Sequence, residues 1–381
     1  MRSSNIAYLP RLDHLRFLAA GLVLAFHLYH YFFHGWNPNP EAAVIGFIVE
    51  GHTGVALFFT LSGFLFMLIA MQGGIAYGRF LFNRILRIAP LFLVVFYLAI
   101  TLGRDEFAAS DFLYVLFSNI GSPPTSDFFV TGAAWTISVE FTFYLIFPFL
   151  AAFFLAQGWR YLLGVLALLM LFKIVIFTQV DDPIHVLYST LPGRLDQFLI
   201  GMGAARLYHD YRDRMMRVAW PLMISAVVAI YSLLFVLARH ASWMSENRHE
   251  PLWLAWSGLE AIGWAWLILG YLALPPMRGR VAELTARFAE YGGSVSYSLY
   301  LLHASVLLLM QEGWGVLRPS PWFAINYGVN LALAFVLCLG VAALSFTVIE
   351  KPFLGLRRRY VAKPDMRNQG SLPAEEQKSL A

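Results

Sequence analysis

The sequence has few charged residues and a single cysteine. Of its 381 residues only 13% are Asp, Glu, Lys or Arg, whereas 59% belong to the hydrophobic set AVILMFWYC. Soluble domains carry about 25% charged residues, so this composition excludes an ordinary soluble enzyme and a disordered polymer. With Cys338 alone, the sequence offers no disulfide framework, paired-cysteine metal site or dithiol redox motif. We interpret this thiol as a small buried hydrophobe.

Long hydrophobic runs, in contrast, are abundant. A membrane-spanning helix needs about 20 mostly apolar residues, and roughly ten such runs follow one another along the chain. The sequence therefore predicts an all-α integral membrane protein, a bundle of about ten transmembrane helices within a domain of residues 1–360. We place the runs at 15–34, 44–71, 88–103, 135–156, 161–178, 188–208, 219–238, 252–274, 292–312 and 322–349.

The distribution of basic residues orients this bundle. Most of the 27 Lys and Arg residues fall in the terminal segments and in alternate loops that share one side. Because such residues accumulate in cytoplasmic loops, both termini are predicted to be cytoplasmic. The first run is too long for a signal peptide and lacks a small-residue cleavage site, so we expect it to remain in the mature protein. The basic residues form no aromatic-interleaved patch, which excludes nucleic-acid binding.

Two segments are too polar to span a membrane. Residues 361–381 are predicted to form a disordered cytoplasmic tail. In the long exterior loop 104–134, residues 110–118 could lie flat at the membrane surface.

The first hydrophobic run carries ionisable groups at membrane depth. Each such side chain costs on the order of 3 kcal/mol, which makes it a candidate functional group. Arg16 and His27 are eleven residues apart, about three helical turns, so they share one face with roughly 16 Å between their backbones. Arg16 is either a snorkelling anchor or part of a site. His27 is either a buried structural histidine or a proton-transfer group, because imidazole titrates near neutral pH.

Acidic and basic groups recur near the predicted outer surface. Glu140 lies one to two turns into the fourth run and is predicted to share the depth of His27. A carboxylate beside a histidine fixes its tautomer and stabilises the imidazolium, although a structural contact between helices is the alternative. Arg194 and Asp196 could bind a ligand, pair with each other or pair with a neighbour.

Further polar groups lie on the predicted cytoplasmic side and near the midplane. Arg84 and Arg87, one helical turn apart, could bind the phosphates of an anionic cofactor or anchor the chain to anionic lipid. Ser62-Gly63 could permit close helix packing or line a passage. His303 follows a cluster of hydroxyl groups, where a lone histidine is more often structural. The isolated groups Lys173 and Glu260 have no assigned role.

Two classes of protein fit these residues: an enzyme that passes a group across the membrane, and a transporter whose buried titratable groups carry protons. A transporter is expected to show broken helices at corresponding positions of two halves. No such symmetry is evident in the sequence, which favours the enzyme.

Several motifs together resemble the membrane-bound acyltransferase 3 family. Residues 12–20, Leu-Asp-His-Leu-Arg-Phe-Leu-Ala-Ala, with the Arg-x10-His spacing to His27, are similar to the first helix of that family. Further stretches resemble its later signatures in the same order, so that the resemblance covers residues 11 to about 356. These stretches are 54–64, 84–90, 135–148, 193–201, 296–303 and 350–353.

The resemblance implies an activity and its partners. It implies transfer of an acyl group, most often acetyl, from cytoplasmic acyl-CoA to a hydroxyl of a sugar, lipid-linked glycan or cell-envelope glycan, in a bacterial plasma membrane. Acyl-CoA would be a co-substrate, and no bound cofactor or metal is expected. Some family members append an exterior hydrolase-like domain that completes the transfer. We detect none here and expect the chain to act alone or with a separate partner.

The candidate site residues fall into three groups. The catalytic group has His27 as base or transient acyl carrier, Arg16 as its motif partner, and Glu140. The donor group comprises Arg84, Arg87, Ser62 and Arg11, and the acceptor group Trp135, Arg194, Asp196, Tyr297 and His303. Membrane lipids and a second copy of the chain are further expected partners. The alternative function is a proton-coupled transporter or exporter of a glycosylated or acylated metabolite.

Overall fold

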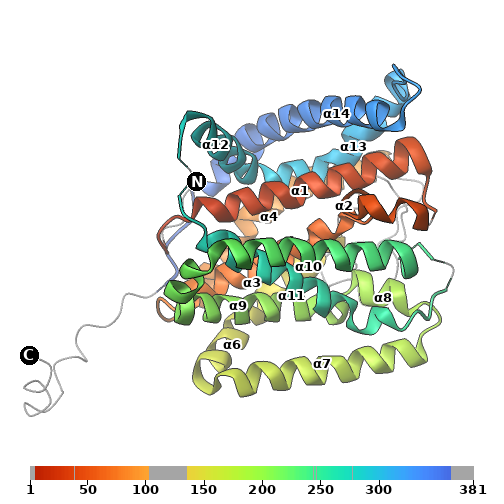
Figure 1. Ribbon diagram of the computed structural model, residues 1–381. Helices are drawn as coiled ribbons and strands as arrows, with labels where there is room; N and C mark the ends of the chain where they lie inside the picture. The colour runs from red at the N-terminus through yellow and green to blue at the C-terminus, as the bar shows by residue number, and fades with distance from the viewer. Residues whose placement is uncertain are drawn as a thin grey trace, which may run out of the picture.

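The computed structural model describes residues 5–37, 39–102, 135–242, 244–245, 247–276 and 278–361. Within these ranges all regular secondary structure is helical, and the sole extended pairing is an antiparallel bridge between Ile75 and Val361. Most of the long helices run side by side along one axis (Figure 1). The predicted all-α fold class is confirmed.

Eight helical stretches of the described chain are long and apolar enough to cross a membrane. Five are single helices: α4 (Tyr77–Leu102), α6 (Trp135–Gln157), α7 (Trp159–Gln179), α10 (Ala219–His240) and α11 (Leu252–Ala273). The other three are composite. They are α1 (Pro10–Tyr29) with a π-helical turn at His30–His34; Pro40–Ile45 with α2 (Gly46–Val49), Gly51–Thr53 and α3 (Gly54–Ala70); and α14 (Phe323–Ser345) with Phe346–Glu350 and α15 (Lys351–Leu354).

Two predicted runs have a different form. The ninth run, 292–312, covers the end of α12 (Arg280–Ser294) and most of α13 (Ser296–Trp314). These two helices meet at a bend of 74° and form one broken span if they are counted together. The sixth run lies in α8 (Pro183–Ser189) and α9 (Leu191–Arg217). Helix α9 is long enough to span, but it is not among the apolar candidates because charged residues are distributed along it. The total of ten spans and the cytoplasmic termini stay predictions.

The layers of the bundle differ in their burial. The stretch that ends with α3 is central, with 83% of its most apolar window buried, whereas the corresponding values are 17% for α7 and 22% for α14. These two helices lie at opposite edges of the bundle (Figure 1). Their outward side chains, such as Leu171 and Leu344, are 60% and 67% exposed. An edge helix with an apolar outer face is suited to a lipid environment.

Helices α3 and α9 pack at close range through two glycines. A Cβ atom on Gly63 would lie 2.0 Å from the carbonyl oxygen of Phe198, and one on Gly201 would lie 2.1 Å from that of Thr60. Any larger residue at either position forces the helices apart. The expected close approach at Ser62-Gly63 is therefore present.

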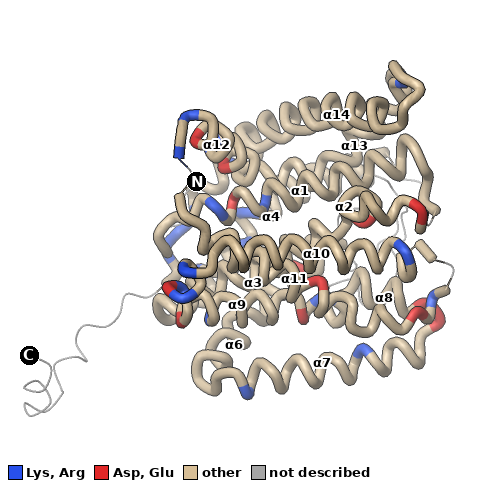
Figure 2. Tube along the Cα trace, viewed as in Figure 1, with Lys and Arg blue, Asp and Glu red and all other residues tan. Residues whose placement is uncertain are grey.

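The two ends of the described chain meet. The side-chain oxygen of Asn5 accepts hydrogen bonds from the backbone N–H groups of Tyr360 and Val361, at 3.0 and 3.2 Å. Lys and Arg residues gather at this same end of the bundle (Figure 2). The expected surface segment 110–118 and residues 362–381 of the expected tail lie outside the described residues.

Helix α4 begins earlier than the sequence predicted. The third hydrophobic run was expected to start at residue 88. The structure begins the helix at Tyr77 and continues it through Pro90. Arg84 and Arg87 therefore project from consecutive turns of one helix, which fixes the spacing of their guanidinium groups.

Candidate active site

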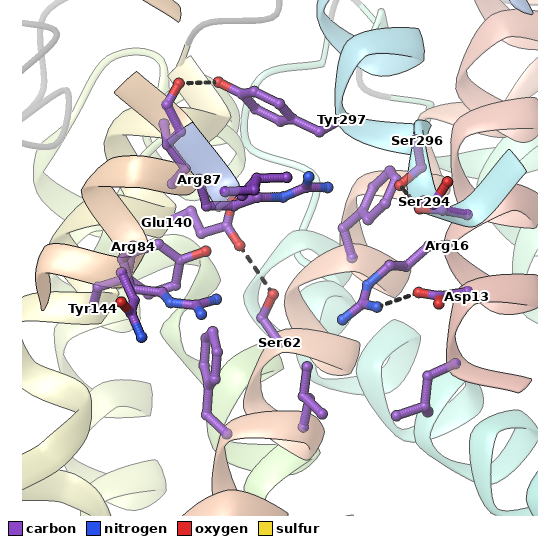
Figure 3. A pocket seen from close by; sticks show the side chains of 18 of the residues that line it. Asp13, Arg16, Ser62, Arg84, Arg87, Glu140, Tyr144, Ser294, Ser296 and Tyr297 are labelled. Atoms are coloured by element: carbon purple, nitrogen blue, oxygen red, sulfur yellow. Dashed lines mark hydrogen bonds and ion pairs between the residues drawn. The ribbon is translucent and has the colours of Figure 1, made fainter. Parts of the chain in front are cut away.

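A cavity of about 540 Å³ lies between α1, α3, α4 and α6, where the α12–α13 bend and the segment after α15 also reach it. Arg84, Arg87 and Glu140 lie on one side of it and Arg16 lies opposite, with Ser62 between them (Figure 3). Half of the predicted site residues line this cavity: Arg16, Ser62, Arg84, Arg87, Glu140 and Tyr297. The structure thus brings together residues from five of the predicted motifs.

The polar groups around the middle of the cavity are held by specific hydrogen bonds. The Ser62 hydroxyl donates to Glu140 Oε1 at 3.0 Å (Figure 3). Arg16 forms an ion pair of 2.6 Å with Asp13 on the preceding turn of α1, and Asp13 also accepts a hydrogen bond of 2.7 Å from the Tyr8 hydroxyl. The charge of Arg16 is therefore largely neutralised by Asp13.

At the cavity end that Asn5 and Tyr360 line, positive charge exceeds negative charge. Arg87 forms an ion pair of 3.1 Å with Glu350. Arg84 instead lies 5.0 Å from the ring centre of Phe66, and its Nε is buried without a hydrogen-bond partner in the described part of the chain. Such an orphaned donor in a cavity is expected where a ligand supplies the acceptor.

A third arginine joins this cluster. Arg357 lines the cavity, and its pKa is lowered to about 10 by burial and then by the charges of Arg84 and Arg87. Its Nε donates to the backbone carbonyl of Leu354, and within the described ranges it has no carboxylate partner. Three guanidinium groups face two carboxylates, Glu350 paired with Arg87 and Glu140 bonded to Ser62, which leaves an excess of positive charge for an anion. Planar guanidinium groups suit phosphate in particular.

His27 lies outside the residues that line the cavity, in contact with His303. The distance from His27 Nδ1 to His303 Nε2 is 3.1 Å, and the same Nδ1 lies 2.9 Å from the carbonyl oxygen of Val23. Tyr300 connects this pair to the cavity, because its side chain lines the cavity while its backbone carbonyl accepts a hydrogen bond from His303 Nδ1. Tyr300 therefore contacts both the cavity, through its side chain, and His303, through its backbone carbonyl.

The expected contact between His27 and Glu140 is absent among the described residues, where the hydrogen bond of the Glu140 carboxylate is to Ser62. Counting turns from the membrane surface estimates the depth of a residue but not the direction of its side chain around the helix axis. Glu140 faces α3 and the cavity, whereas His27 faces α13.

The predicted acceptor residues Arg194 and Asp196 lie in a buried network between α7, α9 and α11. Asp196 accepts hydrogen bonds from Lys173 at 2.5 Å and from Ser257 at 2.7 Å, and Arg194 pairs with Glu260 at 3.4 Å. Both predicted residues are nearly inaccessible, at 2% and 6% exposure. Neither lines the cavity. The network supplies the partners of Lys173 and Glu260 that the sequence left unassigned.

Two other predicted residues also lie away from the cavity. Trp135 packs near Tyr188 and lies 5.8 Å from the Arg194 guanidinium. Arg11 donates to the carbonyls at the carboxyl end of α11, including those of Tyr271 and Leu272 at 3.1 and 3.0 Å. These carbonyls have no partner within their own helix, so Arg11 acts there as a helix cap.

The sequence interpretation missed Arg357 and Asp13, which line the cavity, and Glu350, which pairs with the cavity residue Arg87. Arg357 belongs to the Arg-Arg-Arg run after the last hydrophobic segment, which was counted only among the basic residues of the predicted cytoplasmic side. Glu350 was noted in the Glu-Lys-Pro-Phe signature, but the ion pair with Arg87 could not be deduced because 263 residues separate the two. For Asp13 the available signal was its place in the same motif as Arg16, and for Glu350 its place in the last family motif; Arg357 lies outside these motifs.

Comparison with known proteins identifies the family. The family described as "Acyltransferase domain" (acyltransferase 3) matches residues 9–349, so the chain belongs to this family. The chain is 25% identical over 384 residues to "Peptidoglycan O-acetyltransferase OatA" of Listeria monocytogenes, which covers 91% of this chain. It is 26% identical over 387 residues to "Putative peptidoglycan O-acetyltransferase YrhL" of Bacillus subtilis, which covers 92%.

These relatives are longer proteins. Each alignment covers 56% of the relative, so the chain spans about half the length of the curated proteins that it matches. No solved structure matches the chain. The predicted family resemblance is confirmed by both the family match and the relatives.

Proposed function

We propose that the protein transfers an acetyl group from acyl-CoA to a hydroxyl of a cell-envelope glycan, within a bacterial plasma membrane. The observation that carries this proposal is the cavity, which has an excess of guanidinium groups at one end and is lined elsewhere by Tyr300, the residue whose backbone contacts the histidine pair. Family membership supports acyl transfer. The printed names of both relatives support peptidoglycan, or a glycan like it, as the acceptor.

The arginine end of the cavity suits the phosphates of a CoA donor. Arg84 and Arg357 have no carboxylate partner in the described residues and remain available for phosphate oxygens, whereas Arg87 is already paired with Glu350. The Lys and Arg residues gathered at this end support a cytoplasmic location, where acyl-CoA is present (Figure 2). The acyl-pantetheine arm would extend from the arginines past Ser62 and Glu140 toward Tyr300.

The chemistry would take place at His27. In one route His27 removes the proton of the acceptor hydroxyl, the oxygen attacks the thioester carbonyl, the carbon–sulfur bond breaks, and the leaving thiolate receives the proton. In the other route His27 attacks the thioester first and carries the acetyl group to the acceptor. Both routes give an acetyl ester and free CoA thiol.

The decisive experiment measures release of CoA thiol by the purified protein in nanodiscs, supplied with acetyl-CoA and peptidoglycan fragments. We expect thiol release that depends on the fragments and is lost in His27→Ala. The matched control is His240→Ala, because His240 is an exposed histidine remote in sequence from every cavity residue. Full activity in His27→Ala would refute the assignment of His27. Absence of thiol release by the wild-type protein would refute the proposed reaction with this acceptor.

The second candidate is proton-coupled export of a glycosylated or acylated metabolite. The buried ion pairs Lys173–Asp196 and Arg194–Glu260 favour it, because ionisable groups at membrane depth often form proton pathways. Counterflow of a labelled metabolite without thiol release would support this candidate. Thiol release matched by acetylated fragments supports the enzyme.

A further inference from the structure

His27 and His303 form a hydrogen-bonded chain whose proton positions can be deduced. His27 Nδ1 lies 2.9 Å from the carbonyl oxygen of Val23, and His303 Nδ1 lies against the carbonyl oxygen of Tyr300. A carbonyl oxygen only accepts hydrogen bonds, so each Nδ1 must carry a proton. Neutral imidazole has one N–H group, which leaves each Nε2 with a lone pair.

The contact between the two rings agrees with this assignment. His303 Nε2 lies 3.1 Å from His27 Nδ1, and the lone pair on His303 Nε2 can accept the proton that His27 Nδ1 shares with the Val23 carbonyl. If the proton were instead on His303 Nε2 and donated to His27, a lone pair of His27 Nδ1 would face the carbonyl oxygen of Val23, and the two would repel each other. Only one arrangement of protons therefore satisfies all three contacts.

We infer that His303 is a positioning residue that, together with the Val23 carbonyl, holds His27 in the Nδ1–H tautomer and leaves His27 Nε2 as the reacting atom. The inference rests on the proposed function for its chemical meaning, but the tautomer itself is a property of the resting protein. His27 Nε2 has no hydrogen-bond partner within the described ranges, and the imidazole ring stacks on Tyr31 with centroids 5.7 Å apart. The ring orientation is thus fixed by Val23, His303 and Tyr31 while Nε2 remains available.

Both routes of acetyl transfer use this arrangement. If His27 is a base, Nε2 takes the acceptor proton, and the resulting imidazolium keeps its Nδ1–H directed at two acceptors, the Val23 carbonyl and His303 Nε2. If His27 is an acyl carrier, Nε2 forms the bond to the acetyl carbon while the carbon–sulfur bond breaks and CoA leaves as thiolate. The Nδ1 proton can then pass to His303 Nε2. In each case His303 stabilises the charged form of His27.

A purely structural contact between α1 and α13 makes different predictions from a positioning role. We therefore compare His303→Leu, which removes the acceptor, with His303→Gln, whose amide oxygen can reach the position of Nε2. We expect His303→Leu to lower kcat about tenfold or more, with an unchanged KM for acetyl-CoA. His303→Gln is expected to recover most of the lost kcat. Thermal unfolding in nanodiscs establishes that both variants are folded.

The direct test is nitrogen NMR of the protein labelled with ¹⁵N-histidine, with the His27 signals assigned by comparison with His27→Ala. We expect a protonated Nδ1 and an unprotonated Nε2 for His27 in the wild-type protein, and a larger share of the Nε2–H tautomer in His303→Leu, where the Val23 carbonyl is the one remaining acceptor for Nδ1–H among the described residues. A proton on His27 Nε2 in the wild-type protein overturns the inference, even if acetyl transfer is observed. Conversely, the expected tautomer in a protein that releases no thiol upholds the inference and refutes only the proposed reaction.

Discussion

At the scale of single residues, the three arginines of the cavity differ in how their charge is balanced. Arg87 is paired with Glu350, while Arg84 and Arg357 face the cavity without a carboxylate partner in the described residues. The unpaired groups repel each other, and a bound phosphate relieves that repulsion. We therefore expect Arg84 and Arg357 to dominate donor binding.

The variants Arg84→Ala and Arg357→Ala test this difference. We expect each to raise the KM for acetyl-CoA about tenfold, which corresponds to loss of roughly 1.4 kcal/mol, with little change in the KM for the glycan. Steady-state kinetics with each substrate varied in turn provides the measurement. Arg278→Ala, at an exposed arginine outside the cavity, is the control. Equal effects on both KM values would argue against a phosphate site.

The buried pair Lys173–Asp196 governs stability at the same scale. Lys173 is 1% exposed, so Lys173→Met leaves the Asp196 carboxylate buried with a hydroxyl partner but without its cation. We expect a loss of about 3 kcal/mol, observed as a lower Tm in detergent. The double variant Lys173→Met with Asp196→Asn should recover part of that loss, because no charge then remains. Arg206→Ala, which breaks an exposed pair with Asp210, should cost less than about 1 kcal/mol.

A Tm for Lys173→Met equal to that of the wild-type protein would show that water or another group already compensates the Asp196 charge.

The buried pairs Lys173–Asp196 and Arg194–Glu260 could not be predicted from the sequence. Their members lie on different helices, 23 residues apart in one pair and 66 in the other, and hydrophobic periodicity gives no information on which helices are neighbours.

At the scale of helices, Gly63 allows α3 to pack closely on α9, one residue after Ser62, whose hydroxyl bonds Glu140 on α6. Gly63→Ala adds a methyl group that would lie 2.0 Å from the carbonyl oxygen of Phe198 in the present backbone. Because this distance is far below van der Waals contact, the helices must separate. We expect a loss of about 1 to 3 kcal/mol in stability, measured as a lower Tm. The matched control is Gly164→Ala on α7, where an added Cβ meets no atom within 4 Å. Indistinguishable Tm values for the two variants would contradict tight packing at Gly63.

Much of the helical arrangement follows from sequence patterns, since eight of the predicted runs coincide with apolar helices of the described chain. Six predicted residues also share the cavity, because motif order and helix periodicity place them correctly. The predicted contact between His27 and Glu140 is wrong, because the rotation of a helix about its axis depends on packing. The contact of His27 with His303 depends on the approach of α1 to α13, which no local pattern encodes.

At the scale of the whole molecule, the concentration of arginines at one end predicts its orientation. Cys338 is 1% exposed, so we expect the native thiol to react slowly with maleimide. Labelling of an introduced cysteine can then be measured above that background. We expect Thr285→Cys on α12 to react only with reagents that enter the cytoplasm. Gln179→Cys at the end of α7, at the opposite end of the bundle, should react with impermeant maleimide added to intact cells (Figure 1). Labelling of Thr285→Cys from outside would invert the proposed topology.

The junction of Asn5 with Tyr360 and Val361 has a consequence for biosynthesis. Residues from both ends of the described chain line the donor end of the cavity, including Asn5 and Arg357. Because translation proceeds from the amino terminus, a nascent chain lacks that wall until nearly the whole domain has left the ribosome and the last helices have been inserted. The arginine end of the cavity is therefore completed last, and a truncated product that stops before α15 would be inserted without it.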